Sequence, residues 1–173
     1  MNIRKLTYTA LMIAVGILLP QIFHMLGGTA AGGTFLPMHI PVLLAGLLLG
    51  PVSGAAAGGL CPVLSCFLTG MPPLAKLPFM LLELAGYGAV SGLAAKNWKL
   101  NSYVSLLLAM AAGRLVNALA LVTAAFLFHL QAPPVVSVWT AVLTGIPGIL
   151  IQLVFIPAVV AACRKVVALH DRA

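Results

Sequence analysis

Long apolar runs that contain almost no charged residues constrain this chain more than any other feature. Between residues 38 and 69 the sequence holds no Asp, Glu, Lys or Arg. Over all 173 residues, 62% are hydrophobic and 6% are charged, whereas a soluble domain has roughly 25% charged residues. A soluble fold of this composition would have no polar surface, so the chain must be solvated by lipid. The sequence therefore predicts an all-α integral membrane protein.

Clusters of helix-breaking residues divide the apolar sequence into six segments. A membrane-spanning helix needs roughly 20 apolar residues, and Gly-Pro, Pro-Pro and Gly-rich clusters mark the breaks. We predict one transmembrane domain over residues 1–173, with helices at about 6–25, 38–49, 52–69, 74–95, 102–129 and 136–163. The Gly-rich segment 26–37 is expected to be an irregular loop. A cleaved signal peptide is the alternative for the first run, but that run is too long for a typical signal core.

The distribution of Lys and Arg predicts the orientation in the membrane. Six spans place the two termini, the turn between the second and third helices, and the loop between the fourth and fifth helices on one side of the membrane. Those segments contain Arg4, Lys5, Lys96, Lys99, Arg164, Lys165 and Arg172, whereas the other side has Lys76. The positive-inside rule then predicts a multi-pass cell-membrane protein with both termini in the cytoplasm. The basic residues form no stripe with interleaved aromatics, so no nucleic-acid partner is expected.

The residues that catalysis or metal binding would need are scarce. Glu83 and Asp171 are the acidic residues of the chain, and no serine lies in a nucleophile motif with a base. The cysteines and histidines lack metal-ligand spacing, and no nucleotide-binding loop occurs. We therefore expect no enzyme activity, no metal and no cofactor, with a small intramembrane enzyme and a ligand-free scaffold kept as alternatives.

Two charged residues are predicted to lie near the middle of the bilayer, Glu83 in the fourth helix and Arg114 in the fifth. A charge at that depth is costly and needs a partner. Glu83 and Arg114 could simply pair with each other, or one or both could also face a polar ligand.

Helical periodicity gives each of these charges polar neighbours. Lys76, Met80 and Tyr87 share the face of Glu83, and Asn117 shares the face of Arg114. The two faces would line one pocket. Gln152 of the sixth helix could form a third wall, with Trp139 and Thr140 nearer the outer end.

Small residues recur at every fourth position in several of the predicted helices. They are Gly46, Gly50, Gly54 and Gly58, then Gly88 and Gly92, and Ala10 and Ala14 in the first helix. Such stripes allow helices to approach closely. Packing inside the bundle explains most of them, and a surface for a partner membrane protein is the alternative, most attractive for Ala10 and Ala14.

Three segments give the chain a resemblance to a known family. Leu-Pro-Met-His-Ile-Pro-Val-Leu-Leu-Ala-Gly-Leu-Leu-Leu-Gly-Pro occupies 36–51, Leu-Thr-Gly-Met-Pro-Pro occupies 68–73 and Glu-Leu-Ala-Gly-Tyr-Gly occupies 83–88. They resemble the substrate-binding S components of energy-coupling factor (ECF) vitamin transporters, a class of ABC importers, and the similarity spans essentially the whole chain.

The resemblance implies a mechanism and a set of partners. An S component has six helices, binds a micronutrient from outside, and docks on a transmembrane coupling subunit driven by two ATPase subunits. Ala10 and Ala14 are similar to the family's docking motif in the first helix. The resemblance implies that ligand contacts come mainly from helices 4 to 6 and the outer loops, which favours Lys76, Glu83, Tyr87, Arg114, Asn117 and Gln152 as substrate-binding residues. We predict Met80, on the same helical face as Glu83, and His39 to bind the substrate with them.

The resemblance does not select one substrate. The class includes pantothenate, pyridoxine, hydroxymethylpyrimidine, folate and cobalamin, with a biotin-type S component as the alternative. If Glu83 and Arg114 neutralise each other, Lys76 leaves the pocket slightly positive. A positive pocket favours a ligand with a carboxylate or phosphate, such as pantothenate.

Overall fold

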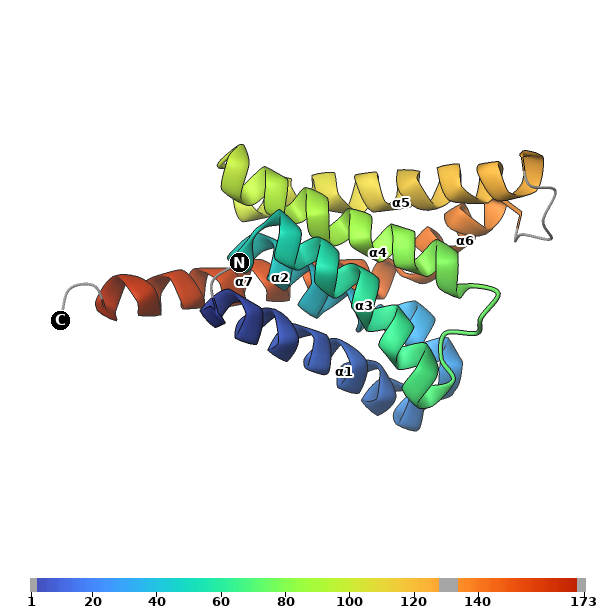
Figure 1. Cartoon of the computed structure of the whole chain (residues 1–173), viewed down its shortest axis with the longest axis horizontal. Helices are drawn as coiled ribbons and strands as arrows, with labels where there is room; N and C mark the ends of the chain where they lie inside the picture. Colours follow the sequence, from blue (N-terminus) through green and yellow to red (C-terminus); the bar gives the residue numbers. More distant parts are fainter. Residues whose placement is uncertain (1–2, 128–133, 171–173) are drawn as a thin grey trace.

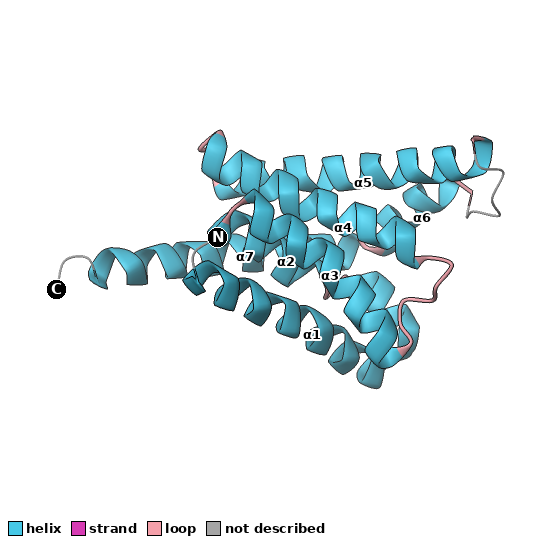
Figure 2. Ribbon diagram, viewed as in Figure 1, coloured by secondary structure: helices cyan, strands magenta, loops and turns pink. Residues whose placement is uncertain are grey.

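The computed structural model describes residues 3–127 and 134–170, except for the side chains of residues 29, 164 and 166–170. This part of the chain is helical with short connections, and the helices pack side by side in a bundle (Figures 1 and 2). In chain order the elements are α1 (Ile3–Phe35), α2 (His39–Leu49), α3 (Pro51–Thr69), α4 (Leu77–Gly92), a π-helical turn η1 (Leu93–Asn97), α5 (Ser102–Phe126), α6 (Val136–Thr144) and α7 (Ile146–His170).

Within the described residues, six helical segments are long and apolar enough to span a membrane. They are Ile3–Gly28, Ala30–Leu49, Pro51–Thr69, Leu77–Asn97, Ser102–Phe126 and Ile146–Cys163. The predicted all-α membrane fold with six spanning helices is therefore confirmed.

The first connection differs from the expected irregular loop. α1 bends sharply at Gly27 and Gly28, where Gly28 has a φ of 65°, a conformation that is easy for glycine and unfavourable for other residues. The chain is then helical again to Phe35. Gly32 lies inside this second segment and packs closely on the His24 ring, which leaves no room for a Cβ.

The predicted sixth helix, 136–163, is also divided in the structure. α6 ends at Thr144 and α7 begins at Ile146. Pro147 follows at the second position of α7, where its missing N–H does no harm, whereas its ring disfavours a continuous helix through Gly145. α6 therefore forms a separate short helix at one end of the bundle. The predicted end of the fifth helix, 128–129, lies outside the described residues.

Helices α2, α3 and α4 form the centre of the bundle. α2 is buried on most sides, with Val42, Leu43 and Ala45 fully inaccessible, which explains why its sequence is apolar all round. α3 and α4 meet backbone to backbone. A Cβ on Gly88 would lie 2.0 Å from the carbonyl oxygen of Gly54, and a Cβ on Gly58 would lie 2.2 Å from that of Leu84.

These contacts settle the role of most of the glycine stripe. Gly54, Gly58, Gly88 and Gly92 allow α3 and α4 to approach so closely that no side chain fits between them. Gly50 has a different role, because it forms the turn between α2 and α3 with a φ of 106°. For these glycines, close packing and turn formation are sufficient explanations.

The connections alternate between the two ends of the bundle. The N-terminus, the α2–α3 turn, the α4–α5 connection and the end of α7 lie at one end (Figure 1). The α1 bend, the α3–α4 loop and α6 lie at the other (Figure 1). Lys96 and Lys99 are exposed at the first end, whereas Lys76 is exposed at the second. The second end is called the α6 end below.

Candidate functional site

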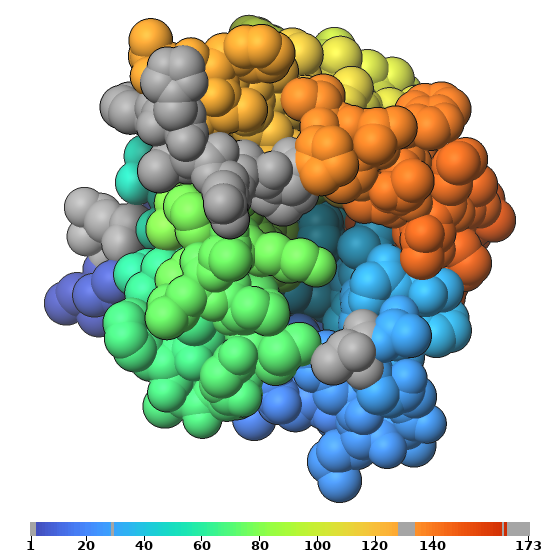
Figure 3. Space-filling model, turned by 90° about the vertical axis from the view of Figure 1, so that its right-hand side faces the viewer, coloured from blue at the N-terminus to red at the C-terminus, as the bar shows by residue number. Residues whose placement is uncertain are grey.

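A cavity of about 860 Å³ opens at the α6 end of the bundle. Its volume is within the range of roughly 300–1,000 Å³ that is typical of small-molecule sites. Viewed toward this end, the molecule is hollowed between the α1 bend, the α3–α4 loop and α6 (Figure 3). The walls come from α1 to α6, with Ser65 as the contribution of α3, and from the loop that carries Met71, Pro72 and Pro73.

Apolar side chains form much of the cavity wall. Met38 lies at the start of α2, Phe79 and Met80 belong to α4, and Leu121 belongs to α5. Methionine side chains adapt their shape readily to different ligands. This part of the cavity can hold the apolar body of a small molecule.

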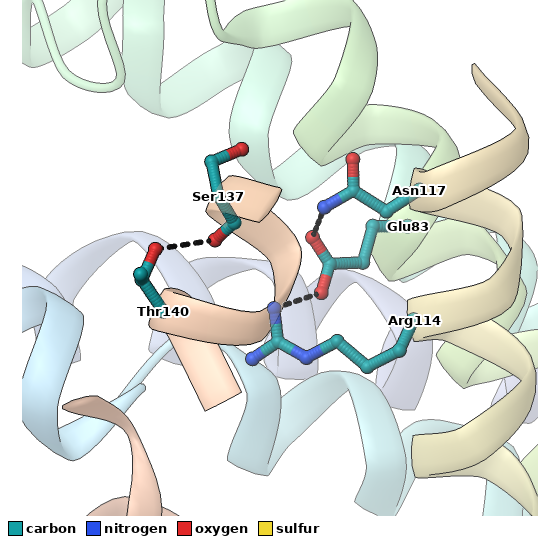
Figure 4. A network of polar contacts seen from close by, with 5 residues as sticks. All are labelled: Glu83, Arg114, Asn117, Ser137 and Thr140. Atoms are coloured by element: carbon teal, nitrogen blue, oxygen red, sulfur yellow. Dashed lines mark hydrogen bonds and ion pairs between the residues drawn. The ribbon is translucent and has the colours of Figure 1, made fainter. Parts of the chain in front are cut away.

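Three polar side chains form a network on one wall of the cavity. Glu83 projects from α4, and Arg114 and Asn117 project from α5 (Figure 4). Arg114 Nη1 lies 2.8 Å from Glu83 Oε1, and Asn117 Nδ2 donates a hydrogen bond of 2.7 Å to Glu83 Oε2. Both carboxylate oxygens therefore have a partner. Glu83 and Arg114 pair with each other, and both also line the cavity.

The same network leaves two polar atoms without a partner. Within residues 3–127 and 134–170, Arg114 Nη2 and Asn117 Oδ1 are buried and make no hydrogen bond. In Figure 4 both atoms lie on the sides of their groups that face away from Glu83. A buried polar group without a partner costs about 1–3 kcal/mol. A bound molecule that supplied an acceptor and a donor would remove that cost.

His39 and Tyr87 lie at different depths. His39 lines the cavity, and its ring packs edge-on against the Tyr87 ring with the centroids 5.0 Å apart. Tyr87 is 3% exposed and is not among the residues that line the described cavity. It packs closely on Gly113, where a Cβ would lie 2.7 Å from its Cδ2. The structure therefore places Tyr87 beneath the predicted pocket, as a support for His39.

Gln152 is also displaced from its predicted position in the pocket wall. It is 1% exposed, and its Nε2 donates a hydrogen bond of 3.3 Å to the carbonyl oxygen of Leu36. Leu36 has a positive φ of 50° in the turn before α2, so Gln152 holds this turn against α7. Gln152 is not among the described residues that line the cavity, and the helix predicted to carry it into the wall is broken at Gly145.

α6 supplies the third wall of the cavity. Ser137, Thr140, Ala141 and Thr144 line the cavity, and the Thr140 hydroxyl donates to the carbonyl oxygen of Ser137 at 3.0 Å. Trp139 points elsewhere and is 63% exposed. Ser137 and Thr144 were not expected in the site, although the Ile-Pro after Gly145 could have indicated a separate helix.

Lys76 lies at the rim and lines the cavity while remaining exposed. It immediately precedes α4, one turn closer to the α6 end than Met80. Of the eight candidate residues, the cavity lining contains Lys76, Met80, Glu83, Arg114, Asn117 and His39.

Ala10 and Ala14 are on the outer surface of the bundle. Both are exposed on α1, and only 11% of the most apolar stretch of this span is buried. The opposite face of the helix carries the contacts: Thr9 is 3% exposed, and Gly16 packs on Cys61 of α3. α1 is thus a peripheral helix with a free face of small residues.

A bundle of membrane-spanning helices with a largely apolar cavity at one end, which carries a polar network on one wall, is suited to binding a small molecule. Residues 4–160 match the family described as ECF transporter, substrate-specific component. The chain belongs to this family, so the predicted resemblance is confirmed, and the protein is a multi-pass membrane subunit that binds a substrate for an ECF transporter. The family is one of transport components rather than enzymes. No curated protein and no solved structure matches the chain.

Proposed function

We propose that this S component binds a water-soluble vitamin or vitamin precursor with high affinity in the cavity at the α6 end. The network of Glu83, Arg114 and Asn117 carries the proposal, because charged and amide groups at this depth need a polar partner and two of their atoms have none in the described residues. The substrate class comprises pantothenate, pyridoxine, hydroxymethylpyrimidine, folate and cobalamin, with biotin as the alternative.

The proposed orientation places the cavity on the outer face of the cell membrane. Arg4, Lys5, Lys96 and Lys99 are exposed near the end of the bundle that holds both termini. The positive-inside rule assigns that end to the cytoplasm. The substrate would then enter from outside between the α1 bend, the α3–α4 loop and α6.

The proposed partner surface is the exposed face of α1. Ala10 and Ala14 are spaced so that they lie on one side of the helix, and small residues let a second helix approach closely. This face would contact the transmembrane coupling subunit, which in turn carries two ATPase subunits. The chain has no nucleotide-binding motif of its own, so transport energy must come from these partners.

Purification of the protein from cells tests the proposed function directly. Denaturation of the purified protein should release one vitamin or vitamin precursor in near-stoichiometric amount, and mass spectrometry would identify it. Co-expression with the coupling subunit and the ATPases of the same cell should yield a complex that co-purifies. If the protein carries no small molecule and associates with no ATPase, the proposed function is wrong.

Variants of α1 test the partner surface separately. Ala10→Trp or Ala14→Trp should abolish co-purification with the coupling subunit and uptake into cells, because the indole prevents close helix contact. Substrate affinity of the isolated protein should not change. Leu119→Trp is the matched control, since Leu119 is 56% exposed on α5, across the bundle from α1 (Figure 1). Loss of substrate affinity in the alanine variants would instead make α1 part of the binding site.

A further inference from the structure

The charges that line the cavity leave it with an excess of positive charge. Among the described lining residues, Lys76, Glu83 and Arg114 carry formal charges. Glu83 and Arg114 form an ion pair of 2.8 Å, which leaves the charge of Lys76 unbalanced. Lys76 is exposed at the rim, so its charge attracts anions toward the mouth of the cavity. The cavity is therefore better suited to an anion than to a neutral molecule or a cation.

Glu83 occupies one of the two terminal nitrogens of the Arg114 guanidinium, and the other nitrogen is available to a ligand. Nη1 is held by Glu83, and Nη2 is buried without a hydrogen-bond partner in the part of the chain that the structure describes. Arginine cannot lose its charge in proteins and has only donors. The free Nη2 therefore requires an acceptor, and a carboxylate or phosphate oxygen forms the strongest bond with it.

The orientation of the Asn117 amide follows from its contact with Glu83. A carboxylate only accepts hydrogen bonds, so the NH₂ group of Asn117 must face it, and the observed bond is 2.7 Å. Asn117 Oδ1 then points away and has no partner among the described residues. Arg114 and Asn117 are three residues apart on α5, so their side chains are neighbours on one face. A free acceptor and a free donor thus lie at the two ends of one network, on either side of the Glu83 carboxylate (Figure 4).

We infer that the substrate is a small anion that combines a carboxylate or phosphate, bound by Arg114 Nη2, with a hydroxyl or N–H group, bound by Asn117 Oδ1. Lys76 at the rim adds attraction for the anionic group during entry. The apolar body of the substrate packs on Phe79 and Met80. Glu83 is a positioning residue, because it orients both groups without contacting the substrate. The inference rests on the proposed function, since it assumes that this cavity is the substrate site.

Matched pairs of probes test the charge of the substrate. Calorimetry of ligand-free protein would compare pantothenate with its alcohol pantothenol, biotin with biotinol, and pyridoxal phosphate with pyridoxal, and would include pyridoxine and hydroxymethylpyrimidine as uncharged probes. The anion of at least one pair should bind at least about 100-fold more tightly than its uncharged analogue, as expected for two charge-assisted interactions. Equal or tighter binding of an uncharged probe would overturn the inference and leave the proposed function standing.

If none of these probes binds, the charge of the substrate is read from the small molecule that co-purifies with the protein from cells. An anion with a hydroxyl or N–H group supports the inference, whereas a neutral or cationic molecule overturns it. If the protein carries no small molecule, binds no probe and associates with no ATPase subunit, both the inference and the proposed function are wrong.

A conservative variant tests the role of Arg114 in the same assay. Arg114→Lys keeps a positive charge beside Glu83 but has no second terminal nitrogen for the substrate. Affinity for the anion should fall roughly 10- to 100-fold, and affinity for the uncharged analogue should change little. Leu115→Ala is the control, because Leu115 is the next residue on α5 and is 61% exposed. An equal loss for both members of the pair would contradict a contact between Arg114 and the anionic group.

Discussion

Arg114→Met is expected to weaken substrate binding by at least about 100-fold and to destabilise the protein by about 3–5 kcal/mol. The variant removes the free Nη2 from the cavity, and it also leaves the Glu83 carboxylate, which is 6% exposed, without its cationic partner. Binding is measured by calorimetry with the small molecule that the wild-type protein retains. Stability is measured by thermal unfolding in the same detergent.

A double variant separates these two effects. Glu83→Leu combined with Arg114→Met removes both charges, so it should recover most of the lost stability, because apolar replacement of a whole buried ion pair is often close to neutral. Substrate binding should stay lost, because the donor is still missing. Recovery of both properties would show that Arg114 serves the fold and not the substrate.

Gly58→Ala is expected to have one of the largest effects on stability among conservative changes in the bundle. The added methyl group would lie 2.2 Å from the carbonyl oxygen of Leu84, so α3 and α4 would have to separate where their backbones meet. We expect a loss of about 3 kcal/mol, at the upper end of the range for overpacking, because the obstacle is backbone and cannot change rotamer. The measurement is thermal unfolding of the purified variant.

The neighbouring glycine is a matched control for this prediction. A Cβ on Gly59 would have no atom within 4 Å, so Gly59→Ala adds the same methyl group to the same helix in open space. It should leave stability unchanged or raise it by about 0.5–1 kcal/mol through helix propensity. If both variants were equally stable, the close approach of α3 and α4 would not contribute to the fold.

The sequence was sufficient to predict the class of fold. A bilayer requires long apolar helices, because backbone polar groups must be satisfied within each span. The buried charges were equally informative. Glu83 and Arg114 stood out because a charge at mid-membrane needs a partner, and the structure brings them to 2.8 Å.

Details of the site depended on contacts that a single sequence does not reveal. Gly27 and Gly32 both lie in a Gly-rich segment, but Gly27 lies at a bend, whereas Gly32 lies inside a helix and packs on His24. Local sequence does not distinguish these roles, since glycine serves both backbone freedom and close packing.

Which residues line the cavity also depends on contacts that a single sequence does not reveal. Tyr87 shares a helical face with Glu83, as predicted, but it lies one turn deeper, where Gly113 and His39 cover it. An unbroken sixth helix would place Gln152 in the pocket wall. The break at Gly145 turns α6 toward the cavity and leaves Gln152 bonded to the Leu36 carbonyl instead.

The central claim is that the substrate occupies the cavity at the α6 end, and two tryptophan variants of α4 test it most directly. Met80 lines the cavity, so Met80→Trp should fill part of it, whereas Leu82 is 46% exposed on the outer surface. Both variants and the wild-type protein would be purified in parallel, checked for equal thermal stability, and denatured for quantitative mass spectrometry of the released small molecule. The wild-type protein and Leu82→Trp should release it in equal amounts, and Met80→Trp should release little or none. Equal release from all three proteins would contradict the assignment of the cavity as the binding site.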